Sequence, residues 1–195
     1  MSDNDSDFNR GFPFSWISDH EGSSNVPGAD PETHAIIEFA SRAPHIFVWL
    51  NLHTFGGVFI RPPFAGSDAK MDHVDLQTYA FLERLVKQRA GLQTVSAIEE
   101  MTPRRDQPMT GTLASWAYEE RGCFAWAVEL WDLFAAAQLK KRKPFFRNYA
   151  IVDRDEIEML VNWDRQFNNS RVFNEWTPFE HPQRGHQKSG DSPSR

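Results

Sequence analysis

Two segments dominate the hydrophobic pattern of this chain. Residues 46–52 form an apolar run in which Asn51 is the only polar interruption. Such a run predicts a strand that is buried on both faces, typical of a central strand in an α/β sheet. In residues 123–130, large apolar side chains alternate with alanines and with Glu129. This strict period of two predicts a second strand.

Helical patterns separate these strands. Asp30 and Pro31 signal a helix start, as N-cap and first helical residue, and Pro44 ends that helix. The other predicted elements are a short strand at 58–61, a long helix at 74–89 capped by Gly91, an irregular polar segment at 94–111, and helices at 113–121 and 158–167. Strands alternating with helices predict an α/β fold with helices on both faces of a sheet.

Composition and charge exclude several classes of function. The formal net charge is −6 and no basic stripe with interleaved aromatics occurs, so we expect no nucleic-acid partner. No apolar run approaches the roughly 18 residues that span a bilayer, and the first ten residues lack a signal-peptide core. The single cysteine, Cys123, rules out an internal disulfide and a cysteine-based zinc site. The compartment and the oligomeric state are left open.

His53 follows the first apolar run and precedes a Thr-Phe-Gly-Gly turn. A histidine at a strand end can bind a metal on the rim of a sheet, but it can equally be a structural residue. Glu129 stands over the small side chains of Ala125 and Ala127 at the end of the second strand. Partial burial there would raise its pKa and suit it to act as a general base, whereas pairing with a nearby Arg or Lys would make it structural.

Asn9 and Arg10 supply a third candidate feature. The planar guanidinium fork of an arginine and the amide of an asparagine suit a carboxylate ligand. Taken alone, such a pair in a loop has little meaning. Its significance depends on which other motifs occur along the chain, and in which order.

Five short segments occur in one order and together resemble the zinc carboxypeptidases, the carboxypeptidase A-like metallopeptidases. The segments are Asp7-Phe8-Asn9-Arg10-Gly11-Phe12-Pro13, Pro31-Glu32-Thr33, His53-Thr54-Phe55-Gly56-Gly57, Trp116-Ala117-Tyr118 and Val128-Glu129-Leu130. The ending Trp176-Thr177-Pro178-Phe179-Glu180-His181-Pro182-Gln183 resembles a bacterial branch of that family. The resemblance runs from Asp7 to about Gly185.

The resemblance implies a role for each candidate residue. His53 would be the third ligand of a Zn²⁺ ion, Glu129 the catalytic general base, and Asn9 and Arg10 the anchor for the C-terminal carboxylate of a peptide substrate. Zinc in such a site polarises the scissile carbonyl and lowers the pKa of its bound water to about 7. The implied fold is a three-layer one, a mixed sheet flanked by helices. The implied activity is the removal of C-terminal amino acids from peptides.

The match departs from the family pattern at important points. A catalytic zinc site needs about three protein ligands, and the family takes two from an H-x-x-E segment that occurs nowhere in this sequence. His34 and Glu38 have a different spacing. Ser115 replaces the acid that usually precedes the tryptophan, and Gly11 replaces a usual asparagine. We therefore expect one zinc ligand in this chain, and the sequence does not define the specificity pocket.

These departures predict an incomplete domain. We expect residues 1–183 to be the C-terminal portion of a zinc carboxypeptidase-like catalytic domain and residues 184–195 to be a disordered tail, possibly out of frame. An upstream reading frame without an H-x-x-E segment would contradict this expectation. The chain alone would then be a weak or inactive metallocarboxypeptidase. The alternatives are a non-catalytic module that binds peptide C-termini, or a fragment without function.

Overall fold

The structure of the chain is a computed structural model that describes residues 6–150, 152–173, 177–181 and 185–189. The chain divides into two compact units, Met1–Asp132 with Lys143–Phe146, and Leu133–Arg142 with Arg147–Arg195. The elements of the first unit are η1 (Phe8–Arg10), α1 (Pro31–Arg42), β1 (Val48–Thr54), β2 (Val58–Arg61), η2 (Asp68–Lys70), α2 (His73–Ala90), β3 (Gln93–Ser96), η3 (Ala97–Met101), α3 (Leu113–Glu119) and β4 (Phe124–Leu130).

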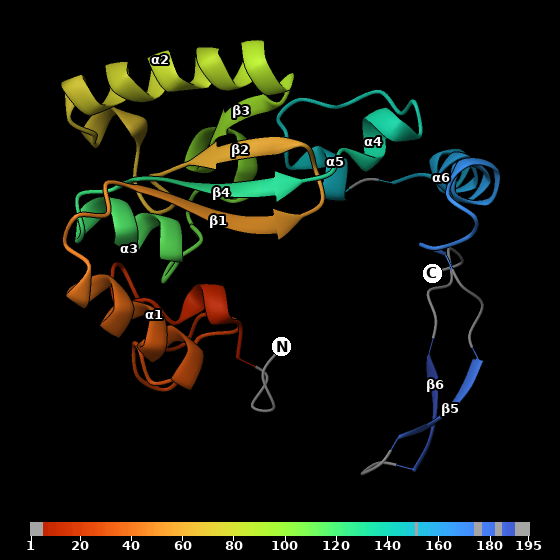
Figure 1. Cartoon of the computed structure of the whole chain (residues 1–195), viewed down its shortest axis with the longest axis horizontal. Helices are drawn as coiled ribbons and strands as arrows, with labels where there is room; N and C mark the ends of the chain where they lie inside the picture. Colours follow the sequence, from red (N-terminus) through yellow and green to blue (C-terminus); the bar gives the residue numbers. More distant parts are fainter. Residues whose placement is uncertain (1–5, 151, 174–176, 182–184, 190–195) are drawn as a thin grey trace. The chain divides into compact units, whose positions relative to one another are not determined.

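A four-stranded mixed sheet forms the centre of the first unit (Figure 1). Its strand order is β1-β4-β2-β3, with β1 parallel to β4, β4 antiparallel to β2, and β2 parallel to β3. Because β1 and β4 are parallel, their carboxyl ends lie side by side at the same end of the sheet (Figure 1). The α/β prediction with a mixed sheet is confirmed.

Helices cover both faces of this sheet. On one face, Trp116 of α3 packs on Trp49 of β1 and on the fully buried Phe12, with ring centroids 6.4 and 5.4 Å apart. On the other face, Tyr79 of α2 packs on Trp126 of β4 at 4.9 Å. The alternation predicted for β4 is confirmed, because each of its faces meets a different hydrophobic cluster.

The prediction that residues 46–52 form a central strand buried on both faces is wrong. β1 lies at the edge of the sheet, and its side chains alternate between exposed and half-buried. Val48, Leu50 and Leu52 are 41, 47 and 60% exposed. The aromatic cluster of α2 is built on β4 and leaves this face of β1 open. An apolar run therefore predicted the strand correctly and its burial incorrectly.

Helix boundaries follow the capping signals, and one strand was missed. Asp30 and Gly91 flank α1 and α2 as predicted, and Gly91 is left-handed at φ 68°. α3 ends at Glu119, two residues earlier than expected. The segment predicted to be irregular, residues 94–111, includes three of the four residues of β3, an edge strand whose Gln93 is exposed and whose Thr94 is half-buried. With only half of its side chains buried, β3 carries no apolar signal in the sequence.

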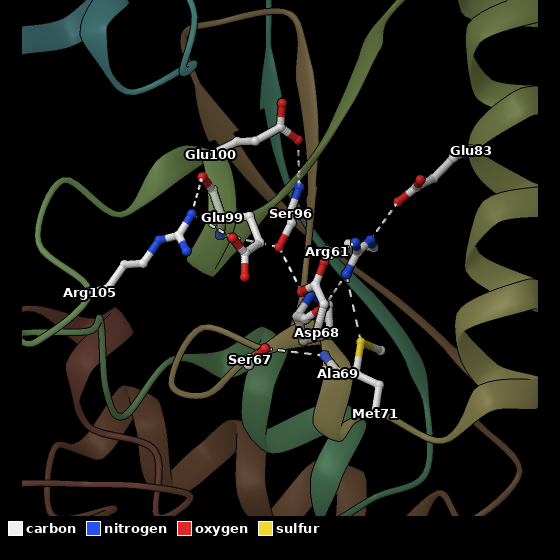
Figure 2. A network of polar contacts seen from close by, with 11 residues as sticks. Arg61, Ser67, Asp68, Ala69, Met71, Glu83, Ser96, Glu99, Glu100 and Arg105 are labelled. Atoms are coloured by element: carbon white, nitrogen blue, oxygen red, sulfur yellow. Dashed lines mark hydrogen bonds and ion pairs between the residues drawn. The ribbon is translucent and has the colours of Figure 1, made fainter.

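A polar network on the α2 side of the sheet ties β2 to its neighbours (Figure 2). The Arg61 guanidinium pairs with Asp68 and lies 3.2 Å from Glu83 of α2. The Ser96 hydroxyl at the end of β3 donates to Asp68 over 2.7 Å. Burial raises the pKa of Glu83, and the charge of Arg61 opposes that rise. These contacts hold the edge strand β3 in place. The network lies away from the carboxyl ends of β1 and β4.

Tyr79 completes the hydrogen bonding of β4 where β2 stops. Proline has no N–H to donate, and β2 ends before Pro62 and Pro63. The Tyr79 hydroxyl instead accepts from the Ala125 N–H at 3.0 Å and lies 3.3 Å from the Ala125 carbonyl oxygen, to which it donates. Burial raises the pKa of Tyr79 well above its ordinary value, so the hydroxyl stays protonated and can donate.

Tyr79→Phe is expected to destabilise the chain by about 1–3 kcal/mol, because it leaves two buried backbone groups of Ala125 without partners. Urea denaturation followed by tryptophan fluorescence measures the loss. Tyr118→Phe is the matched comparison, since its hydroxyl donates to Asp75 at a half-buried position that water can reach. An equal or smaller loss in Tyr79→Phe would contradict this account.

The second unit consists of short helices, one amphipathic helix and a hairpin. Its elements are α4 (Leu133–Ala136), α5 (Arg147–Ala150), α6 (Arg154–Phe167), β5 (Thr177–His181) and β6 (Gly185–Ser189), with β5 and β6 antiparallel. α6 starts four residues before the predicted helix, at a capping box formed by Asp153 and Glu156. The predicted division at residue 183 stays a prediction, and residues 182–184 and 190–195 lie outside the described part of the chain.

Asp164 organises the loop that follows α6. Its carboxylate is fully buried and accepts from the Asn168 amide at 2.8 Å and from the backbone N–H groups of Val172 and Phe173. Burial opposes ionisation of this group, but the hydrogen bonds outweigh it and lower the pKa of Asp164.

None of the helices in the described part of the chain combines the length and the apolar character that a membrane-spanning segment needs.

Candidate functional site

His53 and Glu129 are neighbours at the carboxyl ends of two adjacent strands. They are register partners in the parallel pair β1 and β4, where strands run about 4.8 Å apart. Register partners project from the same face of a sheet, and here that face also carries Trp49 and Asn51. Two residues 76 positions apart in the sequence (129 − 53) are thereby brought side by side.

The ring of His53 has an unpartnered nitrogen. Nε2 is buried and has no hydrogen-bond partner among the described residues. Burial lowers the pKa of His53, while the charges of Asp7 and Arg10 act on it in opposite senses. The neutral imidazole that results is the form that binds a metal ion. Because the charges of Asp7 and Arg10 act on His53, the η1 segment lies close to the end of β1.

Glu129 sits in surroundings that disfavour its charge. Burial raises its pKa from 4.5 to about 7. It has no ion pair with any described Arg or Lys, so the structural alternative of a salt-bridged strand-end carboxylate has no support in the described part of the chain. A carboxyl with a pKa near 7 can both take up and release a proton at neutral pH.

The raised pKa of Glu129 predicts a pH-dependent stability. Between about pH 4.5 and pH 7 the unfolded chain loses the proton that the folded chain still holds, so this group progressively destabilises the fold as the pH rises. Glu129→Gln removes that effect. The melting temperature of the variant, measured with a chelator present, is expected to match that of the unaltered chain near pH 4.5 and to exceed it at pH 7–8. A constant difference across this range would contradict the assignment, and Glu120→Gln is the surface control.

Asn9 and Arg10 lie on η1, which faces the same side of the sheet. The Asn9 side-chain oxygen accepts from the Leu113 N–H at 2.9 Å and lies 3.5 Å from the Asn51 amide nitrogen, which donates to it. Arg10 donates to the Asn9 carbonyl at 2.7 Å and lies 3.7 Å from Asp7. The Arg10 side chain is 19% exposed, so it is held in place yet open to a ligand.

Close backbone packing fixes η1 against the loop before α3. Gly111 has φ 62°, and a Cβ at this position would lie 2.3 Å from the Arg10 carbonyl oxygen. The Phe12 N–H donates to the Gly111 carbonyl at 3.0 Å. The loop therefore requires glycine at 111 and sets the position of Arg10.

A zinc site is supported by one of these residues but is not complete. The unpartnered, buried Nε2 of His53 fits a metal ligand. In the part of the chain that the structure describes, no group of three or more His, Cys, Asp or Glu side chains could hold a metal ion. His34 and Glu38 belong to no such group among the described residues, and Glu38 pairs with Arg42 on α1. The described residues thus do not supply a full zinc coordination shell.

Comparison with known families decides the relationship. The model of a family described as zinc carboxypeptidase matches residues 2–143, well over half of the 195 residues. The chain belongs to the zinc carboxypeptidase family. A search of curated proteins gave no match. Membership places the chain in a family of hydrolases, and the mixed sheet with helices on both faces agrees with it.

The sequence pointed to most of this constellation, with two omissions. His53, Glu129, Asn9 and Arg10 were each selected from sequence, and the structure brings them to one side of the sheet. Asn51 stands out in the sequence as a polar interruption, but the sequence alone assigns it no role. Asp7 belongs to the first matched segment, and only the structure shows that its charge acts to raise the pKa of His53, against the larger effect of burial. A polar residue two positions before a candidate ligand, on the same face of a strand, is the signal that would have identified Asn51.

Proposed function

We propose that this chain carries the carboxylate-binding and general-base part of a metallocarboxypeptidase site, which removes C-terminal amino acids from peptides. The observation that supports it is the pairing of His53 with Glu129 in register, on the face that η1 approaches with Asn9 and Arg10. A carboxypeptidase needs these parts within one substrate length of each other. Family membership supports the proposed reaction class.

Each residue has a distinct task in this proposal. Arg10 and Asn9 bind the terminal carboxylate of the substrate through charge-assisted hydrogen bonds. Because only a chain end offers a carboxylate at that place, this anchor makes the activity that of an exopeptidase. Glu129 takes a proton from the attacking water and returns it to the leaving amine, a task suited to its raised pKa. His53 offers Nε2 to the metal.

A second candidate function is a non-catalytic module that binds peptide C-termini. Two observations favour it. The donors of Asn9 and Arg10 are in place to bind a carboxylate, whereas the described residues cannot complete a metal site. Such a module would bind peptides with a free C-terminus and would be indifferent to a chelator. The carboxylate anchor is common to both functions, and turnover separates them.

The purified chain is expected to retain far less than one zinc per molecule after dialysis, because His53 is its one candidate ligand among the described residues. Metal analysis and a C-terminal cleavage assay with added zinc test this. Near-stoichiometric zinc with turnover would establish the enzyme and refute the proposed weakness of the isolated chain. Binding that needs a free C-terminus and persists with a chelator, without turnover, would favour the module.

A further inference from the structure

Asn51 occupies a place that calls for an explanation. It interrupts the apolar run of residues 46–52 and is half-buried on the face of β1 that also carries His53. Its register partner on β4 is Ala127, which is small and leaves room above the sheet. The Asn51 amide uses that room to reach the oxygen of Asn9, 42 residues away in the sequence.

The two partners of the Asn9 oxygen fix the orientation of its amide. A backbone N–H can only donate, so the side-chain oxygen of Asn9 is the atom that meets the Leu113 N–H at 2.9 Å. Asn51 approaches the same oxygen with its NH₂ group at 3.5 Å. This distance lies at the long end of the range for such a contact, so the Leu113 N–H is the stronger of the two donors to this oxygen.

With its oxygen occupied, Asn9 has only donors left to offer. Its own NH₂ group points away from that oxygen within the amide plane and has no hydrogen bond to any described residue. Next to it, the Arg10 guanidinium has polar contacts with the Asn9 carbonyl and with Asp7 within the described structure. An incoming carboxylate thus meets donors from two neighbouring residues, and a rotated Asn9 amide would present an oxygen that repels it.

We propose that Asn51 is a positioning residue for this anchor, resting on the proposed function. By donating to the Asn9 oxygen, it holds the Asn9 NH₂ group beside Arg10 as a donor to the terminal carboxylate. Asn51 and His53 are two residues apart on one strand face, about 6.5–7 Å along β1. One strand therefore sets the spacing between the support of the anchor and the candidate metal ligand.

Anisotropy of fluorescein-labelled peptides tests the proposal on the full chain. Hexapeptides that end in each of the twenty residues are prepared with a free or an amidated C-terminus, and the pair with the largest difference in Kd is used. Asn51→Leu and Asn51→Asp keep the size of the side chain and remove the donor. Both are expected to lower the preference for the free acid roughly five- to tenfold while leaving amide binding unchanged. Leu50→Ala, on the opposite, exposed face of β1, is the matched control.

The ratio of the two Kd values separates positioning from folding. A variant that simply unfolds more would lose acid and amide binding in the same proportion, so its ratio would stay constant. A preference for the acid that remains within twofold of the unaltered chain in both Asn51 variants would overturn the proposal. If the unaltered chain itself shows no preference for the acid, the proposed function fails and this inference falls with it.

Discussion

Arg10→Ala is expected to abolish the preference of this chain for peptides with a free C-terminal carboxylate. The Arg10 guanidinium is the one positive charge of the anchor, and truncating one partner of a hydrogen-bonded charge pair typically costs about 2–5 kcal/mol, or roughly 30-fold or more in Kd. The preference of Arg10→Lys for the acid peptide is expected to lie between those of the unaltered chain and of Arg10→Ala, because lysine keeps the charge and lacks the planar fork. The readout is the ratio of Kd values for acid and amide peptides.

The control for Arg10 is an arginine with similar chemistry outside the site. Arg42 on α1 is 76% exposed and pairs with Glu38, so Arg42→Ala removes a charge without touching the anchor. Its expected effect on the ratio is negligible. If Arg10→Ala and Arg42→Ala reduce the preference for the acid peptide equally, the anchor has been assigned to the wrong residue. The same result would show that net charge alone governs peptide binding.

Gly111→Ala is expected to destabilise the chain by about 3 kcal/mol or more and to weaken carboxylate binding at the same time. The left-handed conformation at φ 62° costs an alanine about 1–2 kcal/mol. Its Cβ would also lie 2.3 Å from the Arg10 carbonyl oxygen, so either the loop or η1 must shift. A shift of η1 displaces both anchor residues. Urea denaturation and peptide binding measure the two effects.

Gly122→Ala isolates the clash from the backbone conformation. Gly122 has φ 66°, close to that of Gly111, but a Cβ there meets nothing within 4 Å. Its substitution should therefore cost only the conformational part, about 1–2 kcal/mol, and leave peptide binding unchanged. Equal losses for Gly111→Ala and Gly122→Ala would mean that the close approach to Arg10 is relieved without consequence.

Local signals in the sequence predicted elements well and burial poorly. The caps of α1 and α2 and the period of two in β4 depend on neighbouring residues, so the sequence carries them in full. The apolar run of β1 depends on what covers the strand, which no local pattern records. β3 escaped prediction for the same reason, because an edge strand with exposed Gln93 has no need of an apolar alternation.

The sequence by itself determined which side chains could do the chemistry. His53 after an apolar run, Glu129 over alanines, and the Asn9-Arg10 pair are each chemically suited to a role, and their order along the chain matches one family. Only the tertiary structure decided that these residues lie together on one face of the sheet, at the carboxyl ends of β1 and β4. The parallel pairing of β1 with β4 makes His53 and Glu129 neighbours, and the Gly111 loop sets η1 against that face. Strand pairing and close packing join residues far apart in sequence, so no local pattern encodes them.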